Sequence, residues 1–212
     1  MATMETLRSD DPQAPVRAAQ ILASRGIVLY PTDTLYGLGA DALSDEAVAK
    51  VYAIKGREEG KPMHCVVADM TMAAEFGEVT GLAERLAERF LPGPLTLILK
   101  KKEELDTGSV RGLSTIGVRI PHNEFCIRLA KVFRKPFTAT SANKSGQKPE
   151  RSIEKIIAQL GDAAQLIDLV IDAGELPDSL PSTVVDVSSG EAFIVREGAI
   201  PAADIRVTTA PE

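Results

Sequence analysis

Two cations, Lys55 and Arg57, flank a glycine immediately after a predicted helix, and Lys61 follows closely. An arginine guanidinium offers a planar fork to phosphate oxygens, whereas a lysine ammonium offers a mobile point charge. These side chains could therefore hold the phosphates of a nucleotide. The alternative interpretation is a solvated helix C-terminus, because lysine and arginine there also complement the helix dipole.

Another cation, Arg119, lies inside an apolar stretch that reads Thr-Ile-Gly-Val-Arg-Ile-Pro from 115 to 121. Successive side chains of a strand point to opposite faces, so Thr115, Gly117 and Arg119 share one face and the aliphatic residues share the other. If Arg119 is buried, it needs an anionic partner. The alternative is an arginine on an exposed strand face.

Small polar side chains follow two apolar segments that read as strands: the Pro-Thr-Asp-Thr-Leu-Tyr-Gly-Leu-Gly stretch from 31 to 39, and the Ser-x-Asn pair at 141 and 143. Ligands of open α/β sheets bind at the carboxyl ends of strands. Polar turns are the alternative. No Gly-Lys-Ser or Gly-Lys-Thr follows the first stretch, so it is not a Walker phosphate loop. A stretch from 181 to 186, Pro-Ser-Thr-Val-Val-Asp, with Arg196 in the next strand, is a further candidate, although Ser-Thr-Val-Val is also simply a good β sequence.

The formal net charge of −6 at pH 7 argues against a general nucleic-acid binder. The charges are unevenly spread, because residues 100–151 hold 12 basic and 5 acidic side chains, a net charge of +7. This cationic segment indicates an anionic ligand. We interpret it as one wall of a small-molecule site.

Composition and spacing exclude several classes of protein. The longest apolar runs are too short to span a bilayer, and residues 1–15 lack the apolar core of a secretion signal, so we expect a cytoplasmic protein with no membrane contact. Cys65 and Cys126 predict two buried free thiols, and with only two histidines no metal centre is expected. The sequence shows no Ser-His-Asp or Cys-His arrangement, so it predicts no protein nucleophile.

The elements that must position these residues interleave irregularly. Hydrophobic periodicity predicts helices over 12–24, 44–54, 82–90, 125–133 and 153–160, with Ser44 as an N-cap. Strand patterns cover 27–30, 64–68, 95–100, 115–120, 137–140, 169–172, 183–187 and 192–196, and 32–40 reads as a loop. The order predicts an α/β fold with an α+β-like mixed sheet and flanking helices. We expect one domain over 12–206, a flexible N-terminus at 1–11 and a C-terminal tail at 207–212.

Taken in order, the motifs resemble those of the YrdC/TsaC family of threonylcarbamoyl-AMP synthases, in its short single-domain form. The resemblance runs from about Pro15 to Ile200, and its motifs are PTDTLYGLGA at 31–40, KGR at 55–57, PGPLTLIL at 92–99, TIGVRIP at 115–121, TSANKSG at 140–146, PSTVVD at 181–186 and VREGAI at 195–200. The family's Lys-x-Arg and Ser-x-Asn signatures are both intact. The resemblance implies a YrdC-like, twisted, open sheet with a large, concave, positive surface.

The resemblance also implies a reaction. L-threonine, bicarbonate or CO2, and ATP would yield threonylcarbamoyl-AMP and pyrophosphate, with Mg²⁺ bound mainly through the nucleotide. A transfer enzyme complex would then pass the threonylcarbamoyl group to an adenosine of certain tRNAs. Direct contact of this chain with tRNA is a less favoured interpretation. Such a reaction needs positioning and charge neutralisation more than a protein nucleophile.

Site residues follow from the same resemblance. Lys55 and Arg57 would clamp phosphate, and Arg119 would receive the threonine carboxylate. The implied ATP-binding residues are Lys55, Arg57, Lys61, Thr115, Ser141, Asn143 and Arg196. The implied threonine-binding residues are Thr32, Thr34, His64, Arg119, Ala139 and Ser182.

The chain departs from the family pattern at several positions, among them the Lys61-Pro62-Met63 segment, which stands where the family often has Asn-Pro-Leu. Glu58 follows Lys-x-Arg where the family often has proline, and Val66 occupies the place of a family histidine. His64 lies two residues earlier on the same strand face, so we hypothesise that it substitutes for that histidine. Two alternatives to the synthase stay open: a tRNA- or double-stranded-RNA-binding module without synthase activity, and a related nucleotide-binding enzyme with a different substrate.

Overall fold

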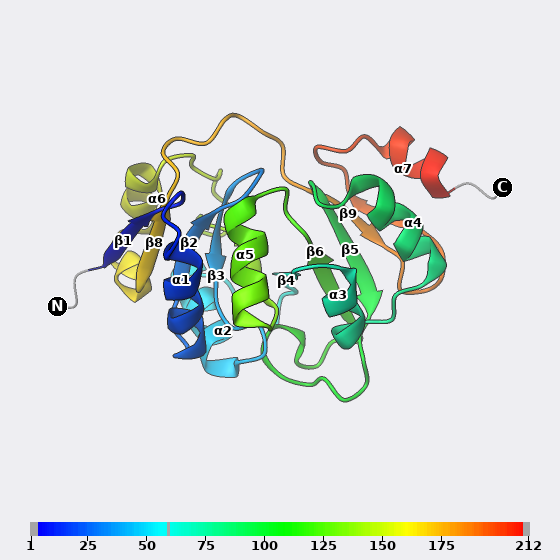
Figure 1. The fold of residues 1–212 in the computed structure, drawn as a ribbon, viewed down its shortest axis with the longest axis horizontal. Coiled ribbons are helices and arrows are strands. Elements are labelled where there is room, and N and C mark those ends of the chain that lie inside the picture. Colours follow the sequence, from blue (N-terminus) through cyan, green and yellow to red (C-terminus); the bar gives the residue numbers. More distant parts are fainter. Residues whose placement is uncertain (1–3, 59, 210–212) are drawn as a thin grey trace.

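A ten-stranded sheet forms the centre of the computed structural model, which describes residues 4–58 and 60–209. The strands lie in the order β1-β8-β2-β3-β7-β4-β6-β5-β9-β10 (Figure 1). They are β1 (Glu5–Arg8), β2 (Val28–Pro31), β3 (Tyr36–Gly39), β4 (His64–Val66), β5 (Leu95–Lys100), β6 (Thr115–Arg119), β7 (Phe137–Ser141), β8 (Leu169–Asp172), β9 (Thr183–Asp186) and β10 (Phe193–Arg196). Parallel pairs such as β5–β9 sit beside antiparallel pairs such as β5–β6, so the sheet is mixed, as predicted.

Seven α-helices flank the sheet in the described part of the chain. They are α1 (Ala14–Ala23), α2 (Asp45–Lys55), α3 (Met70–Phe76), α4 (Gly81–Phe90), α5 (Glu124–Phe133), α6 (Ile153–Leu160) and α7 (Ala202–Thr209). Ser44 caps α2 as predicted, because its hydroxyl oxygen accepts a 3.3 Å hydrogen bond from the Ala47 N–H.

One half of the sheet is covered by helices on both faces. In β2, Val28 and Tyr30 pack with α1 and α5, whereas Leu29 packs with α2 and α6. Burial on both faces explains why this strand is apolar at every position, as in a buried parallel sheet.

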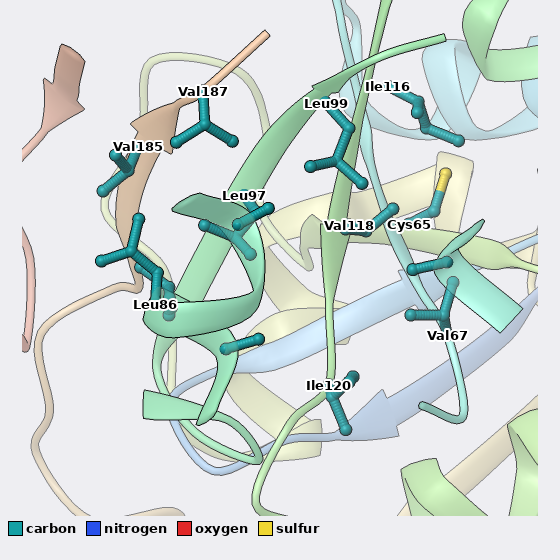
Figure 2. Packing of buried hydrophobic residues seen from close by; sticks show 14 of the residues in the cluster. Cys65, Val67, Leu86, Leu97, Leu99, Ile116, Val118, Ile120, Val185 and Val187 are labelled. Carbon is teal, nitrogen blue, oxygen red and sulfur yellow. The ribbon is translucent and has the colours of Figure 1, made fainter. Parts of the chain in front are cut away.

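The other half, around β5, β6 and β9, is covered on one face only. Leu97 of β5 and Val118 of β6 join Leu86 of α4 in a core cluster (Figure 2). Thr96 and Arg119 alternate with these residues and line a cavity instead. The division of β6 into an apolar face and a face with Arg119 is the one that the sequence predicted.

A crossover from β8 to β9 joins the two halves. Residues 173–182 link strands that stand second and ninth in the sheet, and Figure 1 shows them as the orange segment that arches between the halves. The Ser179 hydroxyl donates a 2.5 Å hydrogen bond to the Thr34 carbonyl oxygen, and Ser182 lines the cavity. The crossover therefore brings the second half of the chain to the residues that follow β2.

The loop predicted over 32–40 is wrong at its C-terminal end, because Tyr36–Gly39 forms strand β3. The glycines that suggested a loop are needed within the strand. A Cβ on Gly37 or on Gly39 would lie 3.0 Å from the Tyr30 ring on the neighbouring strand. Glycine in a strand here marks a close approach, not a turn.

Segments near both ends of the chain also join the fold. Glu5–Arg8 lies within the predicted N-terminal segment 1–11 and pairs in parallel with β8. Helix α7 runs to Thr209, past the predicted domain end at 206. Residues 1–3 and 210–212 of the two predicted terminal segments lie outside the described residues.

Both cysteines are buried and free, as predicted. Burial raises the pKa of the Cys65 thiol to about 11 and raises that of Cys126 as well, so both thiols stay protonated near neutral pH. Within the described residues, every helix is too short or too polar to cross a bilayer.

Candidate active site

A cavity of about 550 Å³ opens on the uncovered face of the sheet. Four cationic side chains line it: Lys55, Arg57, Arg119 and Arg196. Among the lining residues that the structure describes, none is aspartate or glutamate. The concave positive surface implied by the resemblance is therefore present, and it favours an anionic ligand.

Arg119 occupies the end of β6, and its side chain is buried. Its guanidinium donates through Nη2 to Asp33 Oδ1 at 2.5 Å, through Nη1 to Thr34 Oγ1 at 3.0 Å and through Nε to the Gly93 carbonyl at 3.4 Å. Asp33 is thus the anionic partner that burial demanded. These bonds use three of five N–H groups, so one N–H remains on each terminal nitrogen, enough for a bidentate carboxylate.

Lys55 is the last residue of α2 and only 4% exposed. Its ammonium donates to the Ser141 carbonyl, to the Asn143 carbonyl at 3.0 Å and to Asn143 Oδ1 at 3.3 Å. Burial, and then the nearby charge of Arg57, lower the pKa of Lys55 to about 8. The fold thus brings the Lys-x-Arg and Ser-x-Asn signatures together.

The two remaining cations of the cavity, Arg57 and Arg196, each bond to a single neighbouring residue. Arg57 donates through Nη2 to the Pro62 carbonyl at 3.3 Å. Arg196 donates through Nη2 to the Ser182 carbonyl at 2.8 Å and to the Ser182 hydroxyl at 3.2 Å. Their remaining N–H groups can serve a ligand.

Thr96 belongs to the site although its residue type alone did not single it out. Its hydroxyl shares a 3.0 Å hydrogen bond with the hydroxyl of Ser182, and both side chains line the cavity. The signal in the sequence is a polar residue between Leu95 and Leu97, because alternation within a strand puts such a residue on the face opposite the core.

His64 begins β4 and reaches the cavity, whereas Val66 is fully buried beneath α1 and α5. Gly117 makes room for the imidazole, since a Cβ on Gly117 would lie 2.5 Å from His64 Cδ2. This is the arrangement that the proposed substitution for the family histidine needs. Its role in binding remains a prediction.

Positive charge in the cavity also appears in the pKa values of its residues. Burial, followed by the charges of Arg196, Arg119 and Arg57, lowers the pKa of His64 to about 4, so the imidazole is neutral near pH 7. Burial and the Arg119 charge likewise lower the pKa of Arg196. A bound anion would relieve this repulsion.

Most of the predicted site residues meet at the cavity. They are Lys55, Arg57, Ser141, Asn143 and Arg196 of the ATP set, and Thr32, Thr34, His64, Arg119, Ala139 and Ser182 of the threonine set. Two predicted residues are not among the described lining residues. The Lys61 ammonium forms an ion pair with Glu58 at 3.2 Å. Thr115 lies opposite Lys100 in the backbone register of β6 with β5, at the other end of β6 from Arg119.

The cationic segment 100–151 supplies seven of the described lining residues, Arg119 and six between 139 and 146, so it contributes a wall of the cavity, but most of its positive charge lies elsewhere. Of its basic residues, Arg119 is the one found among the described lining residues. Lys100 pairs with Glu78 at 2.9 Å, and Lys135 pairs with Asp41 at 3.4 Å. A net charge summed along the sequence does not show which acids from other segments will neutralise it.

Sequence comparisons agree with this site. The family model Sua5_yciO_yrdC, described as telomere recombination, matches residues 20–198. The chain is 39% identical over 175 residues to a putative threonylcarbamoyl-AMP synthase of Methanocaldococcus jannaschii. The aligned residues cover 82% of this chain and 81% of that relative. It is 36% identical over 189 residues to the threonylcarbamoyl-AMP synthase of Pyrococcus abyssi. This alignment covers 89% of this chain and 55% of that relative.

Solved structures share the fold. A crystal structure of P. abyssi Sua5 complexed with L-threonine matches with a TM-score of 0.86 at 32% identity, over 97% of this chain and 60% of that chain. Escherichia coli YciO matches with a TM-score of 0.82 at 26% identity, over 99% of this chain and 100% of that chain. The chain thus spans little more than half of the longer relative and all of the shorter one.

The fold, the cavity and these relatives define an enzyme of the nucleotidyltransferase type. More particularly, the chain belongs to the Sua5/YciO/YrdC family, as its motifs predicted.

Proposed function

We propose that the protein is a threonylcarbamoyl-AMP synthase, which makes threonylcarbamoyl-AMP and pyrophosphate from L-threonine, bicarbonate or CO2, and ATP. The observation that carries the proposal is the cavity itself. Four cations line it, its described lining holds no carboxylate, and Arg119 keeps an N–H on each terminal nitrogen. Its volume of about 550 Å³ suits small-molecule substrates.

The chemistry divides into two bond-forming steps. The threonine amine attacks the carbon of CO2 and loses a proton, which gives a carbamate. A carbamate oxygen then attacks the α-phosphorus of ATP, the bond from that phosphorus to the bridging oxygen breaks, and pyrophosphate leaves with the electron pair. Both steps depend on bringing anions together, so the enzyme must orient its substrates and offset negative charge.

Arg119 can take one substrate, because its two free N–H groups fit the threonine carboxylate. The hydroxyls of Thr32, Thr34 and Ser182, with His64 and Ala139, line the threonine side of the cavity.

ATP would occupy the part of the cavity bounded by Arg57, Arg196 and the Ser141–Asn143 segment. Arg57 and Arg196 retain N–H groups that can meet phosphate oxygens. Lys61 and Thr115 lie outside the cavity lining and have no part in this proposal.

The cavity does not itself offer a built Mg²⁺ site. Magnesium prefers oxygen ligands, above all carboxylates. No carboxylate lines the cavity among the described residues, and no cluster of three metal-ligating side chains occurs among them. Mg²⁺ would therefore enter as a complex with the triphosphate.

The test is an assay with ATP, bicarbonate and threonine that measures pyrophosphate and the adenylate product. Pyrophosphate should form only when threonine and bicarbonate are both present. Serine, valine and other amino acids serve as controls, and a stronger response to one of them would indicate the related enzyme with a different substrate. Absence of amino-acid-dependent pyrophosphate would reject the synthase.

The RNA-binding alternative gains little from the structure, because the cationic segment that motivated it carries ion pairs with acidic residues of other segments. A later role of the product in tRNA modification, through a separate transfer complex, belongs to the proposal and depends on the same assay.

Replacing Gly117 by alanine should displace the His64 ring, since the new Cβ would lie 2.5 Å from its Cδ2. A ring displaced toward the cavity, which His64 lines, would crowd the threonine side, so we expect the KM for threonine to rise by roughly tenfold, equivalent to about 1.4 kcal/mol. Steady-state kinetics measures this change. The double variant with His64→Ala restores the space: if it keeps the full penalty of Gly117→Ala, the alanine acts through something other than the ring.

A further inference from the structure

Lys55 is joined to the 141–147 loop by both its main chain and its side chain. Helix α2 ends there, because Gly56 adopts a left-handed conformation with φ of 56°. The Lys55 carbonyl accepts a 2.8 Å hydrogen bond from the Ser145 N–H. Its ammonium, on the same side, donates to the loop residues Ser141 and Asn143.

The Lys55 ammonium has no N–H left for a phosphate. An ammonium carries three donors, and three protein oxygens accept from this one: two carbonyls and Asn143 Oδ1. A phosphate oxygen could bind only by displacing one of them. Arg57 differs, since its guanidinium has five donors and one protein contact at 3.3 Å.

Asn143 shows what the ammonium holds in place. Its Oδ1 accepts from Lys55 and from the Ser141 hydroxyl at 2.5 Å. Its Nδ2 donates to the carbonyls of Lys144 at 2.8 Å and Gln147 at 2.7 Å. The Asn143 carboxamide thus cross-links the loop through its hydrogen bonds, and the Lys55 charge holds the carboxamide in place. Removing that charge would leave the buried Asn143 carbonyl without its described donor, whereas the Ser141 carbonyl would keep the Asn143 N–H at 3.0 Å.

We propose that Lys55 is a positioning residue, which holds the 141–147 loop in the shape that presents Ser141, Ser145 and Gly146 to the nucleotide, and that it does not clamp phosphate itself. The inference rests on the proposed function in one respect, that ATP binds beside this loop. Among the basic side chains, phosphate contact then falls to Arg57 and Arg196.

Two substitutions at Lys55 separate positioning from direct contact. Lys55→Met removes the charge, and Lys55→Arg keeps it but spreads its donors over a planar fork that cannot meet three oxygens around one nitrogen. We expect both variants to weaken ATP binding, measured by calorimetry with MgATP, by tenfold or more. A direct phosphate clamp predicts the opposite for Lys55→Arg, because arginine binds phosphate at least as well as lysine does.

Hydrogen exchange of the ligand-free protein gives a readout that needs no ATP. The amides of Ala142 and Ser145 donate to Tyr36 and Lys55 carbonyls at 2.8 Å and should be protected in the wild type. In Lys55→Met they should exchange at least tenfold faster, while amides of the β2 core stay protected. Lys61→Met is the matched control and should change neither exchange nor ATP binding, because Lys61 pairs on the surface with Glu58.

A titration of the wild type covers the case in which both variants fail to fold. The Lys55 ammonium should lose its proton near pH 8, and the Ala142 and Asn143 amide resonances should then shift together. Arg57 faces the same ammonium, and Lys144 and Asp162 border that end of α2. Lys144→Met is the control for these neighbours and should leave the shift in place.

Three results would overturn the proposal. One is ATP binding by Lys55→Arg within threefold of wild type while Lys55→Met loses it. Another is unchanged exchange of the loop amides in Lys55→Met. The third is loop resonances that stay in place when the Lys55 ammonium loses its proton. Failure of the wild type to bind ATP would instead reject the proposed function, and the exchange data would still decide the role of Lys55.

Discussion

Replacing Arg119 by methionine should lower kcat/KM for threonine by about a thousandfold. Two charge-assisted hydrogen bonds to the carboxylate are lost, each worth about 1.5–3 kcal/mol, and each 1.36 kcal/mol is a factor of ten. The effect should be specific to the amino acid, so ATP affinity measured without threonine should change much less. Steady-state kinetics with varied threonine and calorimetry with MgATP give the two numbers.

The same substitution should also destabilise the protein, because it leaves the Asp33 carboxylate almost buried without its cation. Breaking a buried ion pair in this way costs about 3–5 kcal/mol. The double variant with Asp33→Asn removes the stranded charge, so it should recover much of the unfolding free energy in urea but none of the threonine turnover. Recovery of turnover in the double variant, or a single variant within threefold of wild type, would show that Arg119 acts only on the fold.

Arg57→Ala should raise the KM for ATP by roughly 30- to 100-fold, with little loss of stability. One phosphate contact of about 1.5–3 kcal/mol accounts for that range. Stability should be retained, because the described contact of Arg57 is one exposed 3.3 Å bond to a carbonyl. Initial rates with varied ATP, together with a urea unfolding curve, measure both.

Lys61→Ala is the matched control for Arg57→Ala. Lys61 was also predicted to bind ATP, but its ammonium pairs with Glu58 outside the cavity lining. We expect its KM for ATP to stay within twofold of wild type. An equal penalty for the two substitutions would mean that the phosphates extend beyond the cavity and that the Lys61 prediction was right.

Much of the site could be predicted because strands impose a period of two on the sequence. Alternation in 115–119 places Arg119 opposite Val118, and the structure has one in the cavity and the other in the core. The Ser141–Asn143 segment was predicted from its place at the end of a strand, which is also a local pattern. Local patterns of this kind are complete within a few residues and need no knowledge of the rest of the fold.

Other features could not be predicted, because they depend on contacts between distant segments. Nothing near Asp33 in the sequence shows that it will pair with Arg119, and nothing near Lys55 shows that Asn143 will use its ammonium. Strand β3 could not be predicted, because its glycines are required by the close approach of the Tyr30 ring of β2. The periodicity of one strand does not show which side chain of the neighbouring strand will pack against it.

The crossover from β8 to β9 has a consequence for synthesis of the chain on the ribosome. Strand β5 pairs with β9 along four residues, and residues 101–182 must be made between them. Until β9 emerges, one edge of β5 carries unpaired amide and carbonyl groups, and such an edge invites pairing with other chains. The nascent protein therefore passes through a stage that is prone to aggregation and incapable of turnover, since Ser182 and Arg196 complete the cavity only when this edge is closed.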